Sequence, residues 1–213
     1  SSGPSADFDA WFNTLEPSAR TALLEGEFVI PDDIDELTLL KVMNRCGRFA
    51  MDSLVMTIVT THACNFNCIY CYEHKHLAAM SVEVQDKIIE YVRKQQQTLK
   101  NLSITWFGGE PLVAYDVILR LSAGIIDICL KNGINYSADI ITNGYLLNRK
   151  KVQELSGLGV ASAQITIDGP AEIHDSRRML RSGKGTFARI IRNIMDVHDL
   201  ISIVIRVNID RDN

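Results

Sequence analysis

The sequence lacks a long apolar run, an excess of positive charge and a framework of paired cysteines. No stretch is apolar for long enough to span a membrane, and none resembles a secretory signal peptide. The formal net charge of −4 provides no basic surface for nucleic acid. The five cysteines are odd in number, unlike the disulfide framework of a small secreted domain. We therefore expect a cytoplasmic protein that binds neither nucleic acid nor membrane.

Length, composition and apolar spacing predict one folded core with a short lead-in. The 213 residues are 46% hydrophobic and 23% charged, which is enough for one core. Residues 1–5 have no periodic apolar positions, so we exclude them from the fold. Helical spacing of apolar residues covers 8–24 and 35–43, with an acidic turn between them. We therefore divide the chain into a lead-in, 1–50, and a core, 51–213.

After the lead-in, predicted strands and helices alternate to the end of the sequence. Apolar, β-branched runs predict strands at 53–61, 102–107, 138–142, 162–167 and 201–209. Helical spacing predicts helices at 82–99, 117–130, 148–158 and 186–200. Ser81 is a suitable N-cap for the first of these helices, and Gly133 is a suitable stop after the second. Repeated β-α units imply parallel strands with right-handed crossovers, in either an open doubly wound sheet or a barrel.

The last two predicted strands each have one apolar and one polar face. The polar face of the final strand and its extension carries Ser202, Val204, Arg206, Asn208 and Asp210. The preceding strand and its extension place Ser162, Gln164, Thr166 and Asp168 opposite apolar residues. A parallel strand covered on both faces would be apolar throughout. We interpret the polar face as the wall of a ligand-holding lumen, although strand ends that lie in loops would also be polar.

A cysteine-rich loop follows the first predicted strand. Its sequence is Cys64-Asn65-Phe66-Asn67-Cys68-Ile69-Tyr70-Cys71. A Cys-x3-Cys-x2-Cys loop can supply three thiolates to one cubane iron-sulfur cluster and leaves the fourth iron without a protein ligand. That open iron is a place where a substrate or cofactor can bind.

A structural zinc site is the alternative interpretation of the same cysteines. Zinc needs four nitrogen or sulfur ligands, and the nearby candidates are His62, His74 and His76. Zinc sites usually have two separated cysteine pairs, whereas Cys46 and Cys129 are solitary. The spacing therefore favours the iron-sulfur interpretation.

The cysteine loop resembles the signature of the radical S-adenosylmethionine (SAM) superfamily. Further along, Trp106-Phe107-Gly108-Gly109-Glu110-Pro111 resembles its Gly-Gly-Glu motif, and Thr142-Asn143-Gly144 ends the next strand. The run Gln164-Ile165-Thr166-Ile167-Asp168-Gly169-Pro170, followed by His174-Asp175 and Arg177-Arg178, is similar to the subgroup that carries SPASM domains. That subgroup includes anaerobic sulfatase-maturating enzymes and ribosomal-peptide maturases. The resemblance implies a parallel (β/α) barrel.

The resemblance also implies two cofactors, a [4Fe-4S] cluster and S-adenosylmethionine. Cys64, Cys68 and Cys71 are then the three protein ligands of the cluster. Gly108 and Gly109 let the backbone approach closely, although a simple turn would also use glycine. Glu110 is expected to supply a charge for the methionine ammonium group of SAM.

Other residues resemble positions that contact SAM in the subgroup. Tyr70 resembles the aromatic position whose segment contacts adenine. Thr166 and Arg178 correspond to a ribose-side hydroxyl and a carboxylate-binding arginine, a role that suits the planar guanidinium group. The alternative is a solvated basic loop that contains Arg177, Arg178, Arg181 and Lys184, but for Arg178 we favour the ligand role. The further residues expected to face the lumen are Asn143, Asp168 and Asn208.

The function implied by the resemblance is modification of a ribosomal peptide or protein. Such an enzyme cleaves SAM reductively to a 5′-deoxyadenosyl radical, which abstracts hydrogen from the substrate, and it needs an electron donor such as flavodoxin or ferredoxin. Only five strands are predicted where the family barrel has six, and no SPASM segment follows. We therefore expect a C-terminally truncated core with an incomplete barrel. A non-catalytic, cluster-containing module that binds a peptide or protein, and a radical SAM enzyme that acts on small molecules, remain alternatives.

Overall fold

The computed structural model describes residues 6–26, 28–29, 34–49, 52–73 and 78–211. The chain divides into two compact units, 1–50 and 51–213. Two candidate zinc ligands, His74 and His76, lie outside the described residues. In the part of the chain that the structure describes, every helix is too short or too polar to cross a membrane.

The first unit contains three helices, α1 (Ala6–Thr14), α2 (Pro17–Glu25) and α3 (Glu36–Phe49). The segment 8–24 therefore forms two helices, where the apolar spacing predicts one. Pro17 explains the break, because proline lacks a backbone N–H and suits the first turn of a new helix. Asp35 caps α3, since its Oδ1 accepts a hydrogen bond from the backbone N of Thr38 at 3.1 Å.

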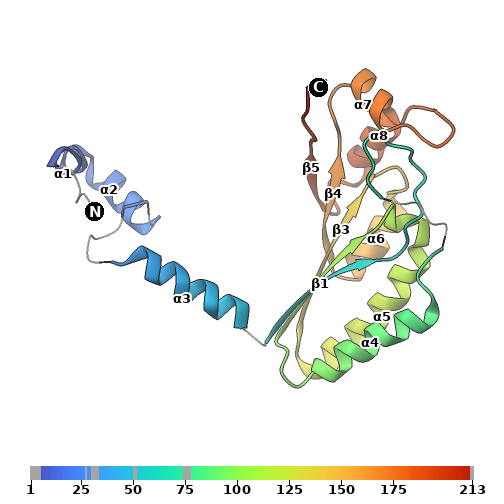
Figure 1. Ribbon diagram of the computed structural model, residues 1–213, viewed down its shortest axis with the longest axis horizontal. Helices are drawn as coiled ribbons and strands as arrows, with labels where there is room; N and C mark the ends of the chain where they lie inside the picture. The colour runs from blue at the N-terminus through green and yellow to red at the C-terminus, as the bar shows by residue number, and fades with distance from the viewer. Residues whose placement is uncertain (1–5, 27, 30–33, 50–51, 74–77, 212–213) are drawn as a thin grey trace. The chain divides into compact units, whose positions relative to one another are not determined.

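The second unit is built on one parallel sheet. Its strands are β1 (Ser53–Val59), β2 (Asn101–Phe107), β3 (Asn135–Thr142), β4 (Val160–Thr166) and β5 (Ser202–Arg206). They pair in the order β1-β2-β3-β4-β5 (Figure 1). Right-handed crossovers in this order place the connecting helices on one face of the sheet. The predicted α/β class with parallel strands is confirmed, and the sequential order rules out the doubly wound alternative.

The connections contain α4 (Val82–Gln95), the short 3-10 helix η1 (Pro111–Ala114), α5 (Tyr115–Asn132), α6 (Arg149–Gly157), α7 (Ala171–Arg177) and α8 (Phe187–Val197). The predicted caps are confirmed: Ser81 accepts a hydrogen bond from the backbone N of Val84, and Gly133 is left-handed with φ 65°. Helix α7 is not predicted from the sequence. It is only seven residues long, too short for an apolar period to be recognised.

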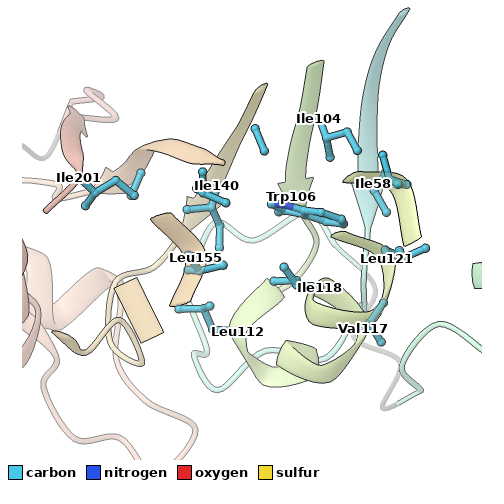
Figure 2. Close-up of a cluster of buried hydrophobic side chains, with 14 of the residues drawn as sticks. Ile58, Ile104, Trp106, Leu112, Val117, Ile118, Leu121, Ile140, Leu155 and Ile201 are labelled. Carbon is cyan, nitrogen blue, oxygen red and sulfur yellow. The ribbon is translucent and has the colours of Figure 1, made fainter. Parts of the chain in front are cut away.

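The hydrophobic core lies between the sheet and the helices on its covered face. Ile104 and Trp106 of β2 and Ile140 of β3 point toward Ile118 and Leu121 of α5 (Figure 2). All five side chains are fully buried. Burial of a large aliphatic or aromatic side chain contributes about 1.5–3 kcal/mol. This core fixes the sheet and leaves its opposite face available for a site.

Strand β5 is shorter than the predicted 201–209. It ends at Arg206, whose partner Thr166 is the last residue of β4. Beyond this point β4 turns away at Gly169, which has φ 127°. Residues 207–210 therefore leave the ladder of β4 and enter the loops that surround the site.

Candidate active site

A cavity of about 480 Å³ opens at the carboxyl ends of the strands. Its wall includes ten of the twelve residues predicted for the site or the lumen: Cys64, Cys68, Tyr70, Cys71, Gly108, Gly109, Asn143, Thr166, Arg178 and Asn208. Glu110 and Asp168 are absent from the wall. Gln164, Thr166 and Arg206, from the polar face of β4 and β5, also line it. The prediction that this polar face lines a cavity is thus confirmed for Gln164, Thr166 and Arg206.

The cysteine loop is held by backbone hydrogen bonds to the segment after α7. The N of Asn67 donates to the O of Met179 at 2.8 Å, and the N of Ile69 donates to the O of Arg177 at 3.0 Å. Phe66 is buried and makes an edge contact with the ring of Tyr145. These contacts fix the position of the loop beside the segment after α7.

The three cysteines of the loop form no disulfide and line one cavity. The Sγ of Cys64 accepts hydrogen bonds from the N of Phe66 at 3.4 Å and from the Nδ2 of Asn143 at 3.8 Å. The same Sγ also donates to the Oδ1 of Asn65 at 3.9 Å. Among the described residues, no group of three His, Cys, Asp or Glu side chains is close enough to hold a single metal ion. Three thiolates on one cavity are the donor set of an iron-sulfur cluster with an open iron.

Gly108 and Gly109 bring the end of β2 against the start of the cysteine loop. A Cβ atom at Gly108 would lie 2.3 Å from the backbone O of Thr61, and one at Gly109 would lie 2.6 Å from the O of His62. Gly108 also has φ 143°, which side chains rarely adopt. The close approach predicted for this pair is thus an approach to the chain's own backbone, and it sets the position of the loop.

Glu110 has a different position from the one expected for a group that contacts SAM. Its side chain is fully buried and is absent from the cavity wall. Oε1 accepts hydrogen bonds from the N of Leu112 at 3.0 Å and the Oγ1 of Thr142 at 2.7 Å, while Oε2 accepts from the N of Asn143 at 2.7 Å. Burial raises the pKa of the Glu110 carboxyl, against the effect of these donors. The carboxylate therefore holds the loop after β3, and the expected direct contact with an ammonium group is not supported.

Asn143 connects the loop after β3 to the cysteine loop. Its Nδ2 donates to the Oδ1 of Asn65 at 2.8 Å, and its Oδ1 accepts from the N of Tyr145 at 3.0 Å. The Nδ2 also reaches the Sγ of Cys64. Through Glu110 and Asn143, the end of β2 and the end of β3 both position the cysteines.

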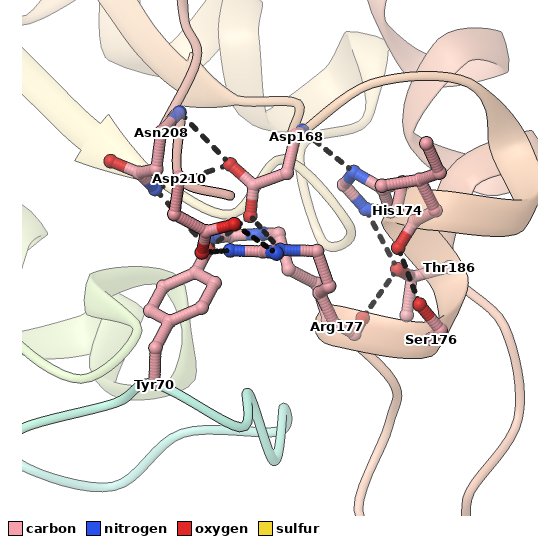
Figure 3. A network of polar contacts seen from close by, with 10 residues as sticks. Tyr70, Asp168, His174, Ser176, Arg177, Thr186, Asn208 and Asp210 are labelled. Carbon is pink, nitrogen blue, oxygen red and sulfur yellow. Dashed lines mark hydrogen bonds and ion pairs between the residues drawn. The ribbon is translucent and has the colours of Figure 1, made fainter. Parts of the chain in front are cut away.

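Tyr70 is the centre of a polar network across the cavity (Figure 3). Its hydroxyl donates to Asp168 and accepts hydrogen bonds from Arg178 and from the Nδ2 of Asn208. Asp168 also accepts from the N and Nδ2 of Asn208 at 3.2 and 3.1 Å. Burial and the hydrogen bond to Asp168 raise the pKa of the Tyr70 hydroxyl. The network ties the cysteine loop to the ends of β4 and β5.

Two neighbouring arginines complete the network, and neither is solvated. Arg177 pairs with Asp210, and Arg178 lies over the rings of Phe66 and Tyr70. Both arginine side chains are buried, so a solvated basic loop does not describe Arg178. The Nε of Arg178 is buried and makes no hydrogen bond within the described part of the chain. Arg178 also lines the cavity, where a planar guanidinium group is suited to an anionic ligand.

Some residues of the cavity wall were not among those predicted to form the site. Glu73 follows the third cysteine directly, and one of its oxygens is buried without a hydrogen bond among the described residues. Arg177 was predicted only as part of a solvated loop. Its position two residues after Asp175 in a polar stretch carries no periodic signal that would have revealed a buried pair with Asp210. Such pairs depend on residues that are far apart in the sequence.

Comparison with known proteins shows which family this chain belongs to. A model of the radical SAM superfamily matches residues 58–210. The serine-type anaerobic sulfatase-maturating enzyme of Bacteroides thetaiotaomicron is 31% identical over 169 residues, which is 68% of this chain and 36% of that enzyme. The PqqA peptide cyclase of Gluconobacter oxydans is 26% identical over 62% of this chain and 36% of that protein.

A solved structure supports the same fold. Native anSMEcpe with bound AdoMet and Kp18Cys peptide has a TM-score of 0.59 and 24% identity, covering 72% of this chain and 42% of that one. The chain thus spans well under half the length of these relatives. Its parallel sheet corresponds to part of their barrel, as predicted. Because the family model matches most of the core, the chain belongs to the radical SAM superfamily.

Proposed function

We propose that this chain is the core of a radical SAM enzyme that modifies a ribosomal peptide or a protein. One observation carries the proposal: three cysteines, a glycine pair and a buried arginine from distant segments line the same cavity. A structural module would need no such combination. The two relatives named for a sulfatase and for the peptide PqqA favour a peptide or protein substrate.

The residues on the wall suit both cofactors. Cys64, Cys68 and Cys71 would hold a [4Fe-4S] cluster, and the cavity of about 480 Å³ would take SAM beside it. When bound, the cluster would supply the one electron needed for reductive cleavage of SAM, and SAM would supply the 5′-deoxyadenosyl group for abstraction of hydrogen from the substrate. Ferredoxin or flavodoxin would serve as the electron donor, and cysteines that form no disulfide favour a reducing, cytoplasmic location.

The chain's own residues bind and orient these groups. Arg178 would meet the SAM carboxylate from the cavity wall, and its Nη1 donates to the hydroxyl of Tyr70. Thr166 presents a hydroxyl from β4 at the same wall. Asn143 donates to the Sγ of Cys64 and so helps to orient this cysteine toward the cluster that it would hold.

The test is release of 5′-deoxyadenosine from SAM by the chain after anaerobic reconstitution with iron and sulfide. We expect the wild type and Cys46→Ser to form it and Cys68→Ser to lose both the cluster and the product. Cys46 is a matched control because it is exposed and lies in the first unit. If the cluster-loaded wild type binds SAM without cleaving it, the proposed enzymatic activity is contradicted and a non-catalytic module is favoured.

The substrate class needs a separate experiment. A candidate precursor peptide is incubated with the reduced enzyme and SAM, and its intact mass is measured. We expect a change in mass that depends on both the enzyme and SAM. If 5′-deoxyadenosine forms while peptides stay unmodified, the small-molecule alternative becomes the better explanation.

A further inference from the structure

His174 is a buried histidine behind the cavity wall that the proposed chemistry does not use. It lies in α7, is fully buried, and makes an edge contact with the ring of Phe187 at the start of α8. It is absent from the residues that line the cavity. A buried imidazole with two ring nitrogens must satisfy both of them, so its partners reveal what it holds.

The two ring nitrogens join two segments that meet at the network of Tyr70. Nδ1 faces the backbone N of Asp168 at 3.3 Å, and Nε2 lies 3.1 Å from the Oγ1 of Thr186 (Figure 3). The Thr186 hydroxyl in turn donates to the backbone O of Arg178 at 2.7 Å. His174 thereby connects the backbones of Asp168 and Arg178, whose side chains both bond to Tyr70.

Only one protonation state of His174 satisfies all the donors and acceptors in this row of hydrogen bonds. The backbone N of Asp168 can only donate, so Nδ1 of His174 must be an unprotonated acceptor. The hydroxyl hydrogen of Thr186 is used on Arg178, so its oxygen accepts from a protonated Nε2. Neutral imidazole with hydrogen on Nε2 satisfies every group. A second proton, on Nδ1, would point at the N–H of Asp168.

We propose that His174 is a positioning residue for SAM binding, and that its neutral form holds Asp168 and Arg178 where the cavity needs them. The inference rests on the proposed function, in which Arg178 receives the SAM carboxylate. Protonation of His174 breaks the bond to the Asp168 backbone and loosens Tyr70 and Arg178 together. SAM affinity therefore falls in acid through a residue that does not touch SAM.

The charged groups around His174 agree with a neutral ring at neutral pH. Burial lowers the pKa of His174, and the Arg178 guanidinium lowers it further. Asp175 in the same helix and Asp168 after β4 act in the opposite direction. Thr186 and Phe187, the residues of the α8 segment in contact with the ring, carry no charge. The ring therefore takes up a proton only below its ordinary pKa range.

The experiment measures the Kd of SAM for the cluster-loaded full chain between pH 8 and pH 5.5. His174→Asn cannot titrate but keeps an oxygen that can accept from Asp168, and His198→Asn is the same change at an exposed position. We expect His174→Asn to bind SAM about five- to tenfold more weakly at pH 8, from the loss of about one hydrogen bond. In acid, the wild type and His198→Asn lose further affinity and His174→Asn changes less.

Two results would overturn the inference while leaving the proposed function standing. One is an equal rise in the Kd of SAM for the wild type and for His174→Asn as the pH falls. The other comes from nitrogen chemical shifts of the wild-type imidazole, which need no variant to fold: hydrogen on Nδ1, or a charged ring at pH 7.5, contradicts the argument. A cluster-loaded wild type that binds no SAM at pH 8 refutes the proposed function, and the inference falls with it.

Discussion

Replacing Glu110 with glutamine tests whether a buried carboxylate holds the site together. The change keeps the shape of the side chain but removes its charge and turns one oxygen into an NH₂ donor. The carboxylate accepts from three donors, the backbone N atoms of Leu112 and Asn143 and the hydroxyl of Thr142. In either orientation, the new NH₂ group faces a backbone N–H, at Leu112 or at Asn143. One buried N–H therefore loses its acceptor.

The magnitude follows from two opposing effects. A buried N–H without a partner costs about 1–3 kcal/mol, and each bond that loses its charged acceptor weakens by about 1 kcal/mol. Relief from burying a charge offsets part of this, because burial is the largest cause of the raised pKa of Glu110. We expect the free energy of unfolding to fall by about 2–3 kcal/mol. The matched control is Glu83→Gln, an exposed residue paired with Lys87 one helical turn away, where the expected change is at most about 0.5 kcal/mol.

The assay is urea unfolding followed by circular dichroism, with both variants compared with the wild type. If Glu110→Gln changes stability no more than Glu83→Gln does, the three hydrogen bonds do not hold the loop. If it stabilises the protein, the cost of burying the charge exceeds what these bonds contribute. Either outcome would refute the role that we assign to Glu110.

Three further predictions concern the glycine pair, the arginine and the histidine. Gly109→Ala should destabilise the protein by about 1–3 kcal/mol and prevent iron uptake, because its Cβ would lie 2.6 Å from a backbone oxygen; iron content and urea unfolding measure both effects. Arg178→Lys should weaken SAM binding about tenfold, since lysine cannot replace the planar group that spans Tyr70 and the ligand; calorimetry on cluster-loaded protein measures it. The pKa of His174 is lowered in the folded protein, so the unfolded chain takes up a proton first as the pH falls below about 6.5. The contribution of His174 to the free energy of unfolding is therefore present above about pH 6.5 and is lost below it. Urea midpoints at pH 7.5 and 5.5 measure the loss.

Each of these predictions has a matched control. Gly157→Ala should be neutral or slightly stabilising, because no atom lies within 4 Å of a Cβ there. Arg181→Lys, at an exposed position, should leave SAM binding unchanged. Non-titrating His174→Asn should lack the acid-dependent part of the loss. Equal behaviour of a variant and its control would contradict the corresponding prediction.

Local patterns in the sequence predicted much of the fold because they depend on neighbouring residues. Five strands, four of the core helices and the caps at Ser81 and Gly133 follow from apolar periodicity and from which residues tolerate a helix end. The cysteine spacing, together with a glycine pair at the end of the next strand, pointed to the same family that comparison then established. These signals are short in sequence, so one chain suffices to detect them.

The tertiary structure alone decided what several of the predicted residues do. Glu110 follows the glycine pair and was expected to face a ligand, yet the loop after β3 surrounds its carboxylate with donors 32 and 33 residues away. Arg177 and Arg178 look alike in the sequence, but one pairs with Asp210 and the other supports Tyr70. The reason is physical: the partners of a buried polar group are set by which segments the sheet brings together, whereas helix, strand and metal-ligand patterns are set by spacing along the chain.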